Sequence, residues 1–139
     1  MEQQDYLKRQ IDLLARMLGK VLAHLVGLKN KGDVSEGIEI TNQILKDELD
    51  LDLDELSAVD TNKFVSKLTG EKGFNNDSLD KLAEILLLVA DSRQRKERKI
   101  LLEKCLAIYV YLQNTETTYS LDRFMKIEKL EKEMSDEAH

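Results

Sequence analysis

The sequence predicts an all-α protein, a bundle of five or six helices in a single helical domain spanning residues 1–139. Proline is absent and glycine occurs only six times in 139 residues, so few positions interrupt a helix. Hydrophobic residues make up 42% of the chain and charged residues 35%, which is enough for an apolar core beneath a charged surface. Apolar residues also recur with helical periodicity along most of the chain.

The clearest periodicity lies in the expected first helix, from Gln3 to Asn30. Its apolar residues recur at alternating spacings of four and three, as in a heptad seam: Leu7, Ile11, Leu14, Leu18, Val21, Leu25 and Leu28. Four further residues widen the apolar face to about half of the helix surface: Leu13, Met17, Leu22 and Val26. A face this wide favours packing against two helices of the same chain, those near Leu79 and Ile100, with homodimerisation as the alternative.

Shorter helices are expected between this first helix and the middle of the chain. Gly32 is a plausible stop for the first helix, and Asp33 with Glu36 forms a capping-box-like start for the second. A tight acidic connection then leads to short helices at about 54–59 and from Asp60 or Thr61. We therefore divide the domain into residues 1–69 (the long helix plus shorter helices), a glycine- and asparagine-rich loop at 70–76, and a three-helix part at 77–134.

Three helices are expected in the C-terminal part. Asp77 is the expected cap of the first, which is apolar nearly all round in its second half and is therefore predicted to be buried. The run from Ile100 to Leu112 predicts a second buried helix, although 108–112 has a strand-like composition. Ser120 is the expected cap of the last helix, with Tyr119 and Phe124 as a hydrophobic staple. Residues 135–139 are expected to fray.

Two resemblances accompany these patterns. The segments Asp5-Tyr-Leu-Lys-Arg-Gln-Ile11 and Asn42-Gln-Ile-Leu-Lys-Asp-Glu-Leu-Asp50 resemble a family of uncharacterised bacterial helical proteins, a domain of unknown function. This resemblance covers the N-terminal third and implies a helical fold and a bacterial source, without a reaction or cofactor. The C-terminal half resembles tetratricopeptide units in its helix pairing, so we expect irregular stacking there. Its helix starts near Leu79 and Leu121 are about 42 residues apart, against a usual repeat of about 34.

A basic cluster is the strongest local charge feature and the only candidate binding patch in the sequence. It consists of Arg93, Arg95, Lys96, Arg98 and Lys99. Such a cluster could bind nucleic-acid phosphates or an acidic partner. Glu97 interrupts it, and the net charge of the chain is −6, so a solvated turn between helices is the favoured interpretation. Positive charge at a helix start is nevertheless unfavourable for the helix dipole.

Other candidate sites are weak. Asp50, Asp52 and Asp54 are spaced like the start of a calcium-binding loop, but the required glycine is replaced by Glu55, so a solvated acidic connection is favoured. His24 beside the seam is interpreted as a structural histidine, and His139 lies at the chain end, so no two-histidine metal site is expected. Cys105 lies in an apolar run and is expected to be an inert core thiol.

The sequence favours an intracellular helical protein-interaction module without catalytic activity, whose partner is another protein or a second copy of the chain. It contains no phosphate-binding glycine loop, nucleophile elbow or paired-cysteine site, so we predict no catalytic, cofactor-binding or metal-ligating residues and no cofactor. The start lacks a signal-peptide pattern and the longest apolar run is 85–90, so we expect a cytoplasmic protein without membrane contact. The alternatives are nucleic-acid or acidic-partner binding through residues 93–99 and, more weakly, an enzyme or small-ligand binder with a cavity between helices.

Overall fold

The structure is a computed structural model that describes residues 2–32 and 34–137, with side chains for 8–32 and 37–136. These residues form seven α-helices and no β-strand, which confirms the all-α prediction. The helices are α1 (Glu2–Lys31), α2 (Val34–Leu49), α3 (Leu53–Ala58), α4 (Thr61–Glu71), α5 (Asn76–Asp91), α6 (Arg95–Thr115) and α7 (Leu121–Glu137). The number exceeds five or six because Asp52 and Asp60 each cap a separate short helix, α3 and α4.

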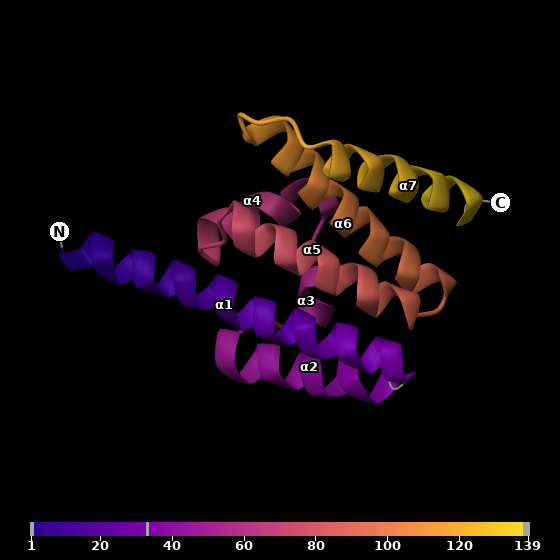
Figure 1. The fold of residues 1–139 in the computed structure, drawn as a ribbon, viewed down its shortest axis with the longest axis horizontal. Helices are drawn as coiled ribbons and strands as arrows, with labels where there is room; N and C mark the ends of the chain where they lie inside the picture. Colours follow the sequence, from indigo (N-terminus) through magenta and orange to yellow (C-terminus); the bar gives the residue numbers. More distant parts are fainter. Residues whose placement is uncertain (1, 33, 138–139) are drawn as a thin grey trace.

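Five long helices lie side by side in the order α2, α1, α5, α6, α7, and the short helices α3 and α4 pack against α6 (Figure 1). Helices α1, α5 and α7 run in one direction, whereas α2 and α6 run in the opposite direction (Figure 1). The C-terminal ends of α1, α5 and α7 therefore lie at the same end of the molecule as the start of α6. Three helix C-terminal ends therefore lie close to the basic residues at the start of α6.

The apolar seam of α1 forms part of the core of the chain. Leu14, Leu18, Val21 and Leu25 are buried, because α1 packs between α2 on one side and α5 on the other. The expected packing against two helices is thus confirmed, but α2 rather than α6 is the second main neighbour. The first part of α1 extends beyond both neighbours in Figure 1, and the side chain of Leu7 lies outside the described residues.

Helices α1 and α2 approach closely because α2 carries small residues at the contact. Gly37 is buried, and a Cβ atom at this position would overlap Leu28 Cδ1. Thr41, one turn further along α2, is also buried. A larger residue at position 37 would therefore force Leu28 to move or the two helices to separate.

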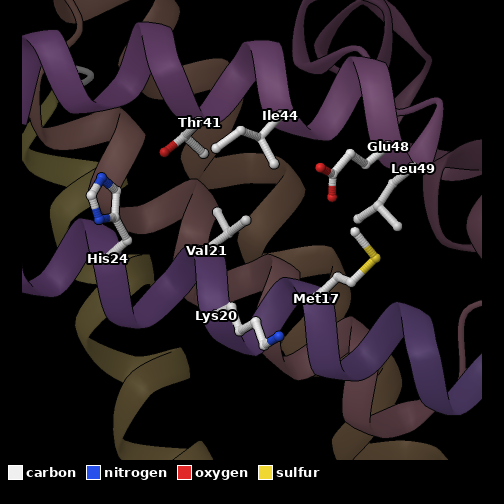
Figure 2. A pocket seen from close by; sticks show the side chains of 8 residues that line it. All are labelled: Met17, Lys20, Val21, His24, Thr41, Ile44, Glu48 and Leu49. Carbon is white, nitrogen blue, oxygen red and sulfur yellow. The ribbon is translucent and has the colours of Figure 1, made fainter.

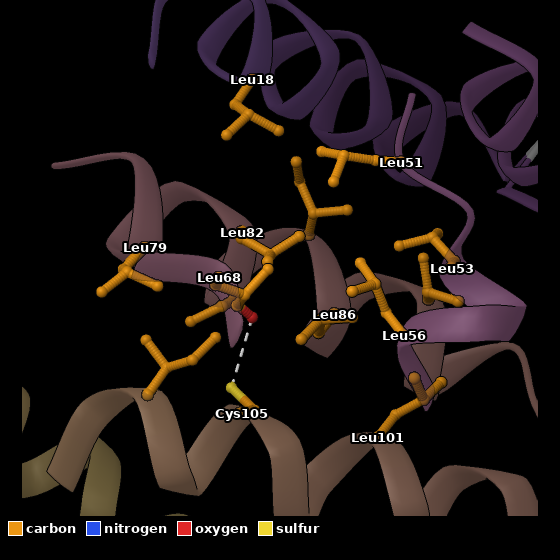
Figure 3. Close-up of a cluster of buried hydrophobic side chains, with 14 of the residues drawn as sticks. Leu18, Leu51, Leu53, Leu56, Leu68, Leu79, Leu82, Leu86, Leu101 and Cys105 are labelled. Carbon is orange, nitrogen blue, oxygen red and sulfur yellow. Dashed lines mark hydrogen bonds between the residues drawn. The ribbon is translucent and has the colours of Figure 1, made fainter. Parts of the chain in front are cut away.

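The core is continuous and contains buried side chains from all seven helices. Its centre consists largely of leucines, including Leu18, Leu51, Leu82 and Leu86 (Figure 3). Cys105 is fully buried there and its thiol donates a hydrogen bond to the Ala83 carbonyl oxygen, with an Sγ–O distance of 3.2 Å. Burial raises the pKa of Cys105, so the group stays a neutral thiol. The expected core position of this cysteine is confirmed.

The loop between α4 and α5 is shorter than the predicted loop at 70–76. Helix α4 continues through Glu71 and α5 begins at Asn76, so the connection spans residues 72–75. Asn75, not Asp77, is the N-cap of α5. The Asn75 side chain accepts from the Ser78 N–H and the Ser78 hydroxyl accepts from the Asn75 N–H, both at 2.9 Å. Asp77 instead pairs with Lys81 at 2.7 Å.

Several other helix boundaries agree with the sequence patterns. Gly32 has a φ of 81°, the left-handed conformation expected at the end of α1. Asp60 caps α4 by accepting from the Asn62 N–H at 3.0 Å. The Ser120 hydroxyl accepts from the Arg123 N–H at 3.2 Å at the start of α7. The capping box expected from residues 33 and 36 lies outside the described side chains.

Residues 108–112 and 135–137, near the C-terminus, are both helical. Residues 108–112 belong to α6, where Ile108, Tyr109 and Leu112 are buried, so their β-branched and aromatic composition reflects burial rather than a strand. Helix α7 continues through Glu137, so residues 135–137 are helical rather than frayed, and 138–139 lie outside the described chain. None of the described helices is both long and apolar enough to cross a membrane.

Candidate functional site

The predicted basic cluster lies where α5 turns into α6. Arg93 is in the turn, and Arg95, Lys96, Arg98 and Lys99 occupy the first turns of α6. All except Arg98 are exposed. Arg98 is half-buried and pairs with Glu133 of α7 at 3.5 Å and with Asp91 of α5 at 4.0 Å. The structure therefore keeps the cluster at one end of the bundle but uses Arg98 to connect three helices.

The position of the cluster explains why positive charge occurs at a helix start. Helices α1, α5 and α7 present their C-terminal ends on this side (Figure 1), and each end carries a partial negative charge that favours nearby cations. Asp91 adds a carboxylate, which also pairs with Lys29 of α1 at 3.4 Å. The basic residues thus oppose the dipole of α6 but complement the dipoles of its neighbours.

The acidic run at 50–54 forms the connection between α2 and α3. Asp52 is the N-cap of α3 and accepts from the Asp54 N–H at 2.9 Å. Leu51 and Leu53 are buried, so this stretch is anchored to the core. Within the described part of the chain, no group of three or more His, Cys, Asp or Glu side chains is placed to hold a metal ion.

One apolar feature of the surface is a groove of about 400 Å³ between α1 and α7, which we name the α1–α7 groove. Leu22 and Val26 of α1, Leu87 and Leu88 of α5, and Leu130 of α7 line it. Most apolar residues of α5 are buried, as predicted, but Leu87 and Leu88 are only half-buried, so the burial is incomplete on this face. Val26 is 44% exposed. Leu130 is buried, but the described part of the chain does not fully cover the other apolar residues of the groove.

Ion pairs hold the rims of the groove in place. Lys29 of α1 pairs with Asp91 of α5, and Lys126 of α7 pairs with Glu84 of α5 at 3.7 Å. Burial lowers the pKa of Lys126, but its hydrogen bond to Asp122 and the charge of Glu84 outweigh burial, so the net shift is upward. Lys126 therefore remains an ammonium group, 5.6 Å from the centroid of the Tyr109 ring.

Lys129 is the exception on this rim. It is exposed, lines the groove and makes no ion pair with the described residues. The groove therefore combines an apolar floor with three lysines and three carboxylates, and among these groups Lys129 alone has no ion pair with the described residues. This combination is suited to recognising a surface that is apolar and carries a negative charge.

Sequence reasoning missed Lys104 of α6, which is only 4% exposed. Its ammonium donates a hydrogen bond to the Thr61 hydroxyl at 2.7 Å and lies 5.7 Å from the centroid of the Phe64 ring. Desolvation lowers the pKa of Lys104, against the charges of Glu103 and Asp60. Its spacing from Leu101 and Ile108 was the available signal, because i−3 and i+4 neighbours share a helix face.

Comparisons with protein-family models, with curated proteins and with solved structures found no match. The resemblances to a bacterial helical family and to tetratricopeptide units remain predictions.

Proposed function

We propose that this protein is a helical interaction module whose α1–α7 groove binds an amphipathic helix of another protein. The observation that carries the proposal is the uncovered apolar floor, contributed by three helices. Partly buried leucines on α5 represent apolar area still in contact with water, and covering such area drives association. The catalytic alternative is not needed to explain any residue of the groove.

The shape of the groove favours a helix as its occupant. Side chains of α1, α5, α6 and α7 line it, so an added helix would continue the side-by-side packing of the bundle. Leu22 and Val26 are one turn apart on α1 and present a ridge to such a helix. A partner with apolar residues at i, i+3, i+4 and i+7 has the matching period.

Charge specifies the partner further. Because the other rim cations face carboxylates, Lys129 is the rim group that lacks an ionic partner among the described residues. An acidic residue beside the apolar stripe of the bound helix would pair with it. The proposed partner is therefore an acidic amphipathic helix rather than a basic one.

The test is a selection from a displayed library of amphipathic helices, followed by fluorescence anisotropy of the selected peptides. Acidic helices should be enriched and should bind the full chain. The V26K variant should weaken binding at least about tenfold, because a charge then enters the apolar floor. The matched control is V110K, since Val110 is 39% exposed but does not line the groove.

Lys129→Glu should weaken acidic peptides, and Lys132→Glu, an exposed neighbour outside the groove, should not. Failure to select any helix, or equal losses in V26K and V110K, contradicts the proposal. A concentration-dependent dimer that V26K abolishes would assign the groove to a second copy of the chain instead.

A further inference from the structure

A second surface feature, separate from the α1–α7 groove, lies between α1 and α2. It is a cleft of about 270 Å³, which we name the α1–α2 cleft (Figure 2). Its walls are partly apolar, from Met17, Val21, Ile44 and Leu49. Its polar lining consists of Lys20, His24, Thr41 and Glu48. None of these four polar side chains makes a hydrogen bond or ion pair within the described chain.

Thr41 is the decisive residue in the cleft. Its side chain is 1% exposed, and its hydroxyl has no hydrogen-bond partner among the described residues. A buried hydroxyl without a partner destabilises a fold, so such groups are normally satisfied by protein or by a bound molecule. Here the hydroxyl lies on the side of the cleft nearest His24 (Figure 2). A ligand in the cleft would give Thr41 its missing partner.

The polar groups have a defined order along the cleft. His24 and Thr41 lie at one end, Met17, Glu48 and Leu49 at the other, and Val21 and Ile44 between them (Figure 2). Thr41 and Glu48 are seven residues apart on α2, about 10 Å along the helix axis. Glu48 is therefore too far away to share a ligand's head group with Thr41. Lys20 lies one turn before His24 on α1, but its ammonium group points toward the Met17 end of the cleft, away from Thr41 (Figure 2).

The donors at the Thr41 end indicate the ligand class. A threonine hydroxyl donates one hydrogen bond, and a histidine ring carries at least one N–H. A group that only accepts, such as a carboxylate, satisfies both of them. The apolar walls then require a hydrocarbon chain attached to that carboxylate.

We propose that the α1–α2 cleft binds a medium-chain monocarboxylate. The carboxylate accepts a hydrogen bond from the Thr41 hydroxyl and lies beside His24. The chain extends over Val21 and Ile44 toward Leu49. This site shares no residue with the α1–α7 groove. Carboxylate binding here can therefore be tested independently of the proposed helix binding.

The experiment is a calorimetric and NMR titration of the full chain with octanoate, octanol and octylamine. Octanoate should bind and shift the amide signals of residues 17–24 and 41–49. Octanol, which lacks the charge, should bind roughly tenfold more weakly. Tighter binding of octylamine, lost in Glu48→Gln, would overturn the carboxylate assignment. Absence of octanoate binding at millimolar concentration would show that only solvent occupies the cleft, and would also overturn it.

Thr41→Val separates a binding role from a structural one. Valine keeps the shape but removes the unpartnered hydroxyl, so the Tm of the free protein should stay unchanged or rise, while the Kd for octanoate rises about tenfold. A lower Tm with unchanged octanoate affinity would make the hydroxyl structural and refute the site. His24→Leu should also weaken octanoate binding, whereas Lys46→Gln, an exposed control on α2 outside the cleft, should not.

Discussion

At the scale of single residues, Lys104 has the most unusual environment. The residue is almost fully buried, and its ammonium group has one hydroxyl partner and one aromatic ring beside it. A buried charge loses hydration that so few contacts replace only in part. The contact between α6 and α4 is therefore specific, but burying the charge destabilises the fold. The same desolvation lowers the pKa of Lys104.

We expect Lys104→Met to stabilise the protein by about 1 kcal/mol at pH 7, because methionine fills the site without a charge. The folded-state pKa lies below the unfolded value of 10.5. Between these two values the unfolded chain binds more protons, so this group makes stability rise with pH. The difference in the free energy of unfolding between Lys104→Met and the unchanged protein should therefore become smaller toward pH 10.

Urea unfolding of both proteins at pH 7 and pH 10 measures this change in the free energy of unfolding. The comparison between the two proteins is essential, because burial also raises the pKa of Cys105 and Tyr109, and these groups lower the stability of both proteins at high pH. Lys99→Met, at an exposed position of the same helix, is the control. A loss of several kcal/mol in Lys104→Met at pH 7 would contradict the expectation.

At the scale of helices, the start of α6 is weakly stabilised by local interactions. Gln94 is the N-cap residue and its side chain makes no cap hydrogen bond. Arg95 and Lys96 then place positive charge in the first turn, where it opposes the helix dipole. The start of α5 differs, because Asn75 and Ser78 form a complete capping box. Helix α6 therefore depends more on packing against α5 and α7 for its start.

Gln94→Asp should stabilise the protein by about 1 kcal/mol, since aspartate at an N-cap accepts from free backbone N–H groups and complements the dipole. Gln94 already has the extended backbone that an N-cap requires, with φ −73° and ψ 162°. Thermal unfolding followed by circular dichroism gives the change in Tm. Asn75→Ala should show an opposite change of about the same size. An unchanged Tm in Gln94→Asp would show that tertiary contacts alone determine where α6 begins.

The sequence patterns predicted the helices better than their ends. The helical periodicity of apolar residues correctly predicted that Leu18 and Leu25 on α1 and Ile108 on α6 are buried. It did so because one face of each helix packs against the core. The predicted N-cap of α5, Asp77, was wrong because aspartate is a common N-cap residue, whereas here Asn75 and Ser78 form reciprocal hydrogen bonds. Caps depend on side-chain geometry over three residues, which a single residue type does not determine.

At the scale of the whole molecule, α1 links the N-terminal and C-terminal parts of the chain. Leu18 is fully buried in the shared core (Figure 3). Leu18→Asp should therefore unfold the isolated chain, at a cost on the order of 4 kcal/mol or more. Circular dichroism and light scattering should show a loss of helix rather than a change of mass.

Leu13→Asp is the matched control, because Leu13 lies on the same helix but is 50% exposed, and this variant should stay folded. A Leu18→Asp protein that keeps its helicity while its mass halves would instead make the seam an interface between copies.

The candidate sites were less predictable than the fold. The α1–α7 groove depends on which of the apolar residues of α5 remain uncovered, and Leu87 and Leu88 look as buried in the sequence as Leu86 does. The α1–α2 cleft brings His24 together with Thr41, from helices whose register only the fold determines. The basic cluster at 93–99 was visible in the sequence, but its three neighbouring helix ends were not.

The parallel arrangement of α1 and α5 also has a consequence for biosynthesis. Lys29 and Asp91, which pair at the ends of these helices, are 62 residues apart in the chain, an interval of about 3 to 12 s at ordinary rates of translation. During this interval the seam from Leu14 to Leu25 has only α2 to cover it. The close contact of Gly37 with Leu28 thus helps an early α1–α2 hairpin to shield the nascent chain until α5 emerges from the ribosome.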